Sequence, residues 1–214
     1  MCGRFSIITL DLEGRFDAKL YFEIQPRYNI APSQDVPIIL NEDTKHFTKA
    51  RWGLVPHWAK DEKIGYKMIN ARAETLLERN TYKGPFKYHR CLIPADGFYE
   101  WKKVGSKKIP FRITMKDNGL FAFAGLYDTW KDMISFTIIT TQPNSLLKPI
   151  HDRMPVILEK KDEKTWLEET DTDRLQKLLR PFSASDMRSV QISDMINSAK
   201  EDNPGVIKPA ALLS

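Results

Sequence analysis

Short apolar segments separated by turn residues fill the first two thirds of the chain. Five of these segments are rich in β-branched or aromatic residues, which favours strands, and they span residues 36–40, 90–93, 111–115, 120–126 and 134–141. Residues 98–103 and 109–114 flank a turn at Gly105 and predict a β-hairpin. An Asp-Asn-Gly turn at residues 117–119 predicts a second hairpin.

Residues that favour helices gather in three further segments, 71–79, 162–169 and 172–180, and Pro181 ends the last of them. From residue 197 onward, prolines and a glycine predict an extended or looped tail. Successive strands with helices beside them, without regular strand–helix alternation, predict an α+β fold around an antiparallel sheet or barrel. No repeat or flexible linker divides the sequence, so we expect one domain over residues 1–214.

The composition is that of an ordinary globular protein, with 42% hydrophobic and 29% charged residues among 214. This excludes a disordered chain, a collagen-like repeat and a coiled coil. The longest apolar stretch, near residues 121–127, is much shorter than the roughly 18 residues that a membrane span needs, so we expect no membrane association. The net charge of +5 permits an anionic partner without requiring one.

The cysteine count restricts the chemistry more than the composition does. With only Cys2 and Cys91, a disulfide framework and a cysteine-rich zinc site are excluded, and no His, Cys, Asp and Glu spacing resembles a metal site. We therefore expect neither a metal nor a cofactor. The start of the chain has no apolar run of signal-peptide length, so we expect a reducing, cytoplasmic setting. Cys91, in a strand-like run, is predicted to lie in the core.

Cys2 follows Met1 directly, and an initiator methionine is normally removed ahead of a small residue. Removal would leave Cys2 as the mature N-terminus, with an α-amine of pKa about 7.7–8.0 and a thiol of pKa about 8.5 on adjacent carbons. Such a 1,2-aminothiol reacts with an aldehyde to give an imine and then a five-membered thiazolidine. It can also attack an acyl group, with its own amine as base. A cysteine at this position by chance is the remaining interpretation.

Glu100 and His151 are the candidates for proton transfer. Glu100 stands among aromatic residues in a predicted strand, where an apolar environment would raise its pKa and suit a general acid. Pairing with a neighbouring lysine explains Glu100 equally well. His151 lies in a loop between prolines, where functional groups concentrate, although a structural histidine fits there too. The remaining histidines are interpreted as surface or structural residues.

Two clusters suit contact with nucleic acid. Arg51, Trp52 and Trp58 mix basic and aromatic side chains, and exposed aromatic rings can stack on unpaired bases. Core packing is the alternative, and we expect it for at least one of the two tryptophans. Asn70 and Arg72 are predicted at the start of a helix, where the N-terminus would favour a phosphate.

Taken together, these segments resemble the SRAP family (SOS-response-associated peptidase domain), also called abasic-site processing proteins. Six blocks carry the resemblance, occur in the family's order and cover nearly the whole chain: MCGRF at 1–5, RYNIAP at 27–32, WGLVP at 52–56, INARAET at 69–75, CLIPADGFYEW at 91–101 and IHDRMP at 150–155. Any one block is weak evidence, whereas six in order are specific.

The resemblance implies a single domain with a β-barrel-like core and flanking helices. It implies that a monomer binds single-stranded DNA in the cytoplasm, associates with the nucleoid when bound, and captures abasic sites covalently as part of the DNA damage response. The implied catalytic residues are Cys2, Asn70, Glu100 and His151. The residues implied to line the DNA path are Arg4, Asn29, Pro32, Trp58, Arg72 and Arg79. The peptidase in the family's name could refer to removal of Met1 by the protein itself.

Two alternatives stay open from the residues. Glutamine amidotransferases that use an N-terminal nucleophile also begin Met-Cys-Gly, although Arg4 and Phe5 depart from the small and apolar residues expected there. In the other alternative, the chain is a non-catalytic module that binds single-stranded DNA, and Cys2 is incidental.

Overall fold

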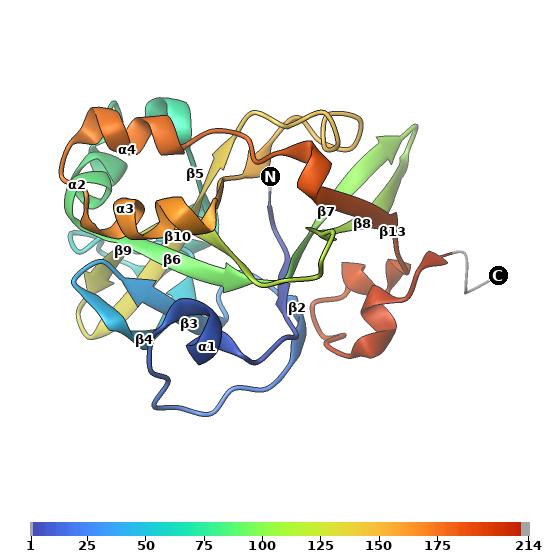
Figure 1. Ribbon diagram of the computed structural model, residues 1–214, viewed down its shortest axis with the longest axis horizontal. Helices are drawn as coiled ribbons and strands as arrows, with labels where there is room; N and C mark the ends of the chain where they lie inside the picture. The colour runs from blue at the N-terminus through green and yellow to red at the C-terminus, as the bar shows by residue number, and fades with distance from the viewer. Residues whose placement is uncertain (1, 211–214) are drawn as a thin grey trace.

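A closed barrel of five strands forms the centre of the fold. The computed structural model describes residues 2–210, and the barrel strands are β3 (Asp35–Leu40), β4 (Asp43–Trp52), β6 (Arg90–Ala95), β9 (Phe121–Trp130) and β10 (Met133–Thr141) (Figure 1). They pair in the order β4-β3-β6-β9-β10, and β10 pairs with β4 to close the ring. All neighbours are antiparallel except β4 and β10, which run parallel. The predicted α+β fold with a barrel-like core is confirmed.

A second sheet of five strands stands beside the barrel. Its strands, in spatial order, are β13 (Met187–Gln191), β8 (Lys107–Met115), β7 (Gly97–Val104), β1 (Phe5–Ile7) and β2 (Arg27–Ile30). Three short strands complete the barrel sheet: β5 (Asn70–Arg72), β11 (Met154–Pro155) and β12 (Ile157–Leu158). Only Asp96 separates β6 from β7, so the chain passes directly from the barrel into the second sheet.

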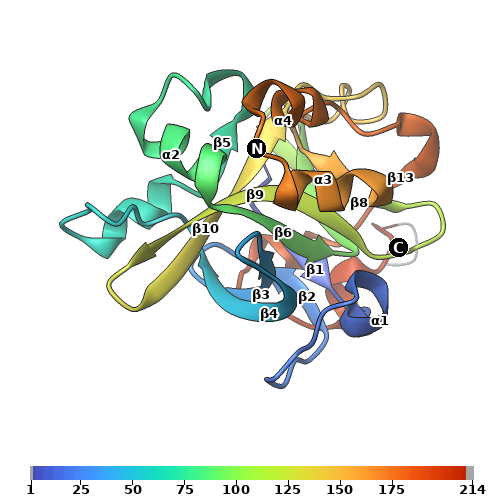
Figure 2. The ribbon, with the colours of Figure 1, turned by 60° about the vertical axis from the view of Figure 1, so that its left-hand side comes forward.

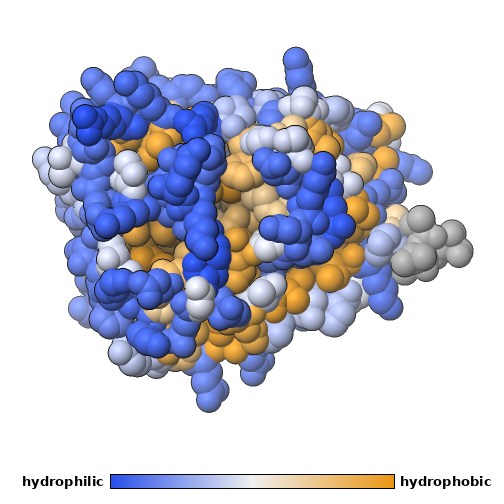
Figure 3. Space-filling model, in the orientation of Figure 1, coloured by the Kyte–Doolittle hydropathy of each residue, from blue (hydrophilic) through white to orange (hydrophobic). Residues whose placement is uncertain are grey.

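The helices are short and lie outside the barrel. They are α1 (Leu12–Phe16), α2 (Asn80–Tyr88), α3 (Lys160–Glu168) and α4 (Thr172–Leu178), with 3₁₀ turns η1 (Glu62–Lys67), η2 (Ala73–Thr75), η3 (Ala184–Asp186), η4 (Asp194–Asn197) and η5 (Pro204–Ile207). Helices α2, α3 and α4 gather on one side of the barrel (Figure 2). Seen from outside, hydrophilic side chains cover that side, and an apolar band separates it from the second sheet (Figure 3). Within residues 2–210, none of the helices has the length and apolarity to span a bilayer.

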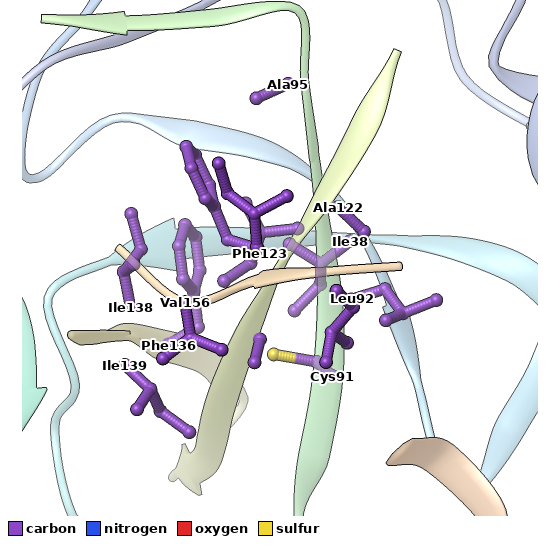
Figure 4. Close-up of a cluster of buried hydrophobic side chains, with 14 of the residues drawn as sticks. Ile38, Cys91, Leu92, Ala95, Ala122, Phe123, Phe136, Ile138, Ile139 and Val156 are labelled. Carbon is purple, nitrogen blue, oxygen red and sulfur yellow. The ribbon is translucent and has the colours of Figure 1, made fainter. Parts of the chain in front are cut away.

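The barrel interior is filled by aliphatic and aromatic side chains, with Cys91 among them (Figure 4). Packing is tight around Gly125, because a Cβ there would lie 2.4 Å from Ile93 Cδ1 and 2.8 Å from Cys91 Sγ. Cys91 is fully buried, which confirms the prediction that it belongs to the core.

Two local predictions were wrong. The turn at residues 117–119 does not close a hairpin, because β8 pairs with β7 and β13 in the second sheet whereas β9 belongs to the barrel. Residues 71–79 do not form an α-helix, although residues 73–75 form the 3₁₀ turn η2. Asn70 to Arg72 pair with β10 as strand β5, and the helix begins only at Asn80. The available partner strand outweighed the helical preference of these residues.

Candidate active site

Strand β1 carries the start of the chain into the interior. Phe5 pairs with Ile30 on one side and with Phe98 on the other, so β1 is held between β2 and β7. The Phe5 ring meets Trp52 and Phe123 edge-on, at centroid distances of 5.1 and 5.8 Å. These contacts anchor the segment on which Cys2 sits, three residues before Phe5.

A buried carboxylate fixes the other end of β1. Asp96 accepts hydrogen bonds from the Ser6 hydroxyl at 2.7 Å, from the Thr9 N–H at 2.8 Å and from the Arg112 guanidinium at 3.2 Å. Gly97 follows it because a Cβ there would lie 2.9 Å from Arg112 Nε. The Asp-Gly pair therefore turns the chain from barrel to sheet and immobilises β1.

The thiol of Cys2 is fully buried. It donates a long hydrogen bond to the Arg4 carbonyl, with Sγ and O 3.8 Å apart. Burial raises the pKa of the Cys2 thiol well above its ordinary value, and the negative charge of nearby Glu100 raises it further. The thiol is therefore protonated at neutral pH and shielded from solvent.

Asn70 is brought directly to Cys2. Its Nδ2 donates to the Cys2 carbonyl at 2.8 Å, and its position is set by the parallel pairing of β5 with β10. Asn70 Oδ1 is buried and has no hydrogen-bond partner among residues 2–210. One amide thus fixes the Cys2 backbone and leaves an acceptor free inside the site.

Glu100 and His151 face each other from different parts of the fold. His151 Nε2 lies 3.9 Å from Glu100 Oε2, and the Glu100 side chain on β7 is only 2% exposed. Burial raises the pKa of Glu100 to about 7. At neutral pH this carboxyl therefore exists in both protonation states, which suits an acid–base catalyst.

His151 makes two contacts through Nδ1. The Arg153 N–H donates to Nδ1 at 3.1 Å, and the Asp152 carboxylate, which is 87% exposed, lies 2.8 Å from the same nitrogen. Nε2 is the ring nitrogen on the Glu100 side. Burial lowers the pKa of His151, which favours the neutral ring.

Arg153 and Glu74 join the His151 loop to the segment that carries Asn70. The Arg153 guanidinium donates to both Glu74 carboxylate oxygens, at 2.6 and 2.9 Å, and to the Thr140 carbonyl at 2.6 Å. Glu74 lies in η2, directly after β5. This ion pair fixes the His151 loop relative to the segment that carries Asn70. Sequence reasoning did not single out either residue, although both lie inside the matching blocks.

An open groove of about 690 Å³ reaches the site from the surface. Its lining combines two of the four proposed catalytic residues, Glu100 and His151, with a tryptophan and several cations. The lining residues are Arg4, Glu100, Trp101, Lys103, Lys108, Ile150, His151, Asp152 and Asn197. Arg4 is thus brought to the groove as expected. Among residues 2–210, no three His, Cys, Asp or Glu side chains lie close enough together to hold a metal ion.

The two tryptophans of the sequence cluster have opposite environments. Trp52 is 1% exposed, and its Nε1 donates to the Ile69 carbonyl, so core packing accounts for it. Trp58 is 56% exposed and is available for stacking. Arg72 and Arg79 are exposed and Pro32 is partly exposed, so these three can meet a ligand.

Asn29 is not brought to the groove. It is fully buried, and its Nδ2 donates to the carbonyls of Ser198 and Glu201 at 2.9 and 2.8 Å. The N–H groups of Tyr28 and Asn29 both donate to Asp202 Oδ1. In this structure Asn29 therefore fastens the C-terminal segment onto β2, and direct contact with DNA stays a prediction.

Comparison with known proteins shows the family and the fold. The family model described as SOS response associated peptidase (SRAP) matches residues 1–199. The chain is 50% identical to the abasic site processing protein YoqW of Bacillus subtilis, over 97% of this chain and 99% of that protein. It is 32% identical to the abasic site processing protein HMCES of Gallus gallus, over 88% of this chain and 67% of that protein. A crystal structure from Bacteroides thetaiotaomicron has a TM-score of 0.90 at 28% identity, covering 98% of this chain and all of that one.

Proposed function

The chain belongs to the SOS response associated peptidase (SRAP) family, and we propose that it captures abasic sites in single-stranded DNA as a covalent adduct of Cys2. The observation that carries the proposal is that Cys2, Asn70, Glu100 and His151 lie close together although they come from four separate parts of the chain, and that Glu100 and His151 line the groove. The names of its relatives as abasic site processing proteins support it. The protein would act in the DNA damage response as a monomer.

The first step is imine formation. Removal of Met1 frees the Cys2 α-amine, and the deoxyribose of an abasic site opens from its hemiacetal to an aldehyde. Glu100, with a pKa of about 7, protonates the ring oxygen and assists opening. The amine attacks the aldehyde carbon, the carbinol oxygen leaves as water, and a C=N bond remains.

The second step closes the ring. The Cys2 sulfur adds to the imine carbon, and the thiol proton moves to the nitrogen, so no further reactant is needed. The raised thiol pKa means that this proton must be relayed as the C–S bond forms, and Glu100 lies near enough to affect that pKa. Asn70 holds the Cys2 backbone, while His151 Nε2 is placed to position a sugar hydroxyl.

Two side activities follow from the same groups. The imine can undergo β-elimination of the DNA strand, which is lyase chemistry. Peptidase activity would consist of the removal of Met1 by the protein itself. Both depend on Cys2, and both need proton transfer: β-elimination needs a base for the proton on the carbon next to the imine, and removal of Met1 needs a water molecule.

Intact-mass spectrometry after incubation with a single-stranded abasic oligonucleotide tests the proposal. The expected product has the mass of the protein without Met1 plus the oligonucleotide minus one water. A protein that retains one residue ahead of Cys2 is the matched control, and it should bind DNA without forming the adduct. An adduct on that blocked protein would overturn the thiazolidine. Robust release of ammonia from glutamine without any adduct would favour the amidohydrolase alternative.

A further inference from the structure

The hairpin of β7 and β8 carries four lysines around its tip: Lys102, Lys103, Lys107 and Lys108. Its register places Lys103 directly opposite Lys108. Like charges opposite each other destabilise a strand pair, and no carboxylate within residues 2–210 forms a salt bridge with any of the four. The uncompensated charge needs another explanation.

The lysines divide into two pairs on opposite faces of the hairpin. Lys103 and Lys108 are paired across the strands and line the groove that also contains Glu100 and His151. By strand alternation, Lys102 and Lys107 belong to the other face, and neither lines the groove. Glu100 shares this second face by the same alternation, so the lining of the groove, and not the face of the hairpin, distinguishes the two pairs.

The distance from Glu100 to Lys103 suits contact with a nucleotide next to the abasic sugar. Lys103 lies three residues beyond Glu100 on β7, which is about 10 Å at roughly 3.3 Å per residue. Between them, Trp101 forms part of the groove wall, and its Nε1 donates to Asn197 Oδ1 at 2.8 Å. The tryptophan is fixed by this bond, so the path from the acid to the lysines is a defined surface.

We propose that Lys103 and Lys108 bind backbone phosphate of the DNA strand one or two nucleotides from the abasic sugar. This site rests on the proposed function and adds to it, since Glu100 is the residue on this hairpin that the family resemblance implies, and none of the four lysines is among the implied residues. Two flexible ammonium groups suit sequence-independent contact with phosphate. They would hold the strand along the groove while the aldehyde reacts at Cys2.

Two double variants test the site, and each removes two charges from the same hairpin. Lys103→Gln with Lys108→Gln alters the groove pair, and Lys102→Gln with Lys107→Gln is the matched control. The probe is a single-stranded oligonucleotide with a tetrahydrofuran abasic analogue, which has no aldehyde and reports non-covalent affinity alone. Dissociation constants are measured over a range of NaCl concentrations, and thermal unfolding confirms that both variants are folded.

Loss of two phosphate contacts should reduce the slope of log affinity against log salt by about 1.4, at about 0.7 for each contact with a single strand. The groove variant should show this change and about tenfold weaker binding at low salt, whereas the control should keep most of the wild-type slope. Equal changes of slope and affinity in both variants would mean that net charge alone causes the effect, and this would overturn the proposal. No change in either variant would overturn it as well.

The proposed function has a separate readout, the yield of covalent adduct by the wild type on a natural abasic site. Normal yield with equal salt slopes in the two variants would overturn the lysine site alone. Absent yield with the predicted difference in slopes would overturn the Cys2 chemistry and leave the lysine site supported.

Discussion

The two cysteines are buried to the same extent, and burial raises the pKa of both thiols, yet they lie in chemically different regions. Around Cys91 the barrel interior is mostly aliphatic and aromatic, and the Tyr127 phenol near it has a pKa that burial raises. Around Cys2 the structure supplies the amide of Asn70 and the carboxyl of Glu100. Burial and thiol pKa therefore do not distinguish a core cysteine from a proposed nucleophile, whereas the polar neighbours do.

Substitution of each cysteine should separate the two regions most strongly. Cys2→Ala should abolish the covalent product, because both the thiol and ring closure are lost, while non-covalent DNA binding persists. Cys91→Ala should form the adduct normally and lose about 1–2 kcal/mol of unfolding free energy from the small cavity left in the barrel. Denaturing gels measure the adduct and urea titration measures stability. Normal adduct yield by Cys2→Ala would make Cys2 incidental.

Glu100→Gln should change both catalysis and the pH dependence of stability. The raised pKa means that the folded protein favours the protonated acid, so this stabilisation is complete below about pH 4.5 and is lost as pH rises to about 7. The shift in pKa corresponds to about 3 kcal/mol of unfolding free energy. The wild type should lose this amount between pH 4 and pH 8, whereas Glu100→Gln should not. Adduct formation should slow by about 100-fold, as expected on removal of a general acid.

The matched control for this change is Glu78→Gln, which removes one exposed carboxylate near α2. Its stability should follow the wild-type pH profile, and its rate of adduct formation should be unchanged. Urea titrations at pH 4 and pH 8 give the stability comparison, and quenched time courses give the rates. If Glu100→Gln keeps the wild-type pH profile, burial does not raise the pKa of this carboxyl in solution.

Glu74→Gln tests whether the Arg153 ion pair positions the site. The variant leaves the buried Arg153 guanidinium without its carboxylate. It should lower the free energy of unfolding by about 1–2 kcal/mol, a moderate amount because Glu74 is 44% exposed and solvent screens the ion pair. Displacement of the His151 loop should slow adduct formation by about tenfold at saturating DNA, while affinity for the unreactive analogue stays unchanged. A parallel loss of affinity would show that the pair supports DNA binding instead of the geometry of the site.

Much of the fold follows from local patterns in the sequence. The hairpin at Gly105 was predicted because strand-like residues flank a turn, and Cys91 was predicted as core because its neighbours are apolar. The same reasoning failed for residues 71–79, where a helix was predicted. Part of this segment forms strand β5, which is stabilised by pairing with β10. Helical preference is a local property, and it says nothing about a partner strand supplied by residues far along the chain.

The site was predictable where a residue is chemically unusual and unpredictable where its role depends on a distant partner. Position and neighbours made Cys2 and Glu100 candidates, and their catalytic roles stay a prediction. The Arg153–Glu74 pair joins residues 79 positions apart, and nothing local marks either as a partner. Asn29 is the opposite case. It lies inside a matching block and was implied to line the DNA path, but its amide is hydrogen-bonded to the C-terminal segment.

The smallest expected effect concerns the two tryptophans, of which Trp52 lies in the core and Trp58 at the surface. Trp58→Ala should weaken non-covalent binding of single-stranded DNA by about 1 kcal/mol, the lower end of the usual contribution from stacking one base on an aromatic ring. Stability should not change, because Trp58 is 56% exposed. Tyr66→Ala, another exposed aromatic at 67%, is the matched control and should bind normally. Equal weakening in both variants would mean that affinity follows exposed aromatic surface in general, and the specific stacking role of Trp58 would be lost.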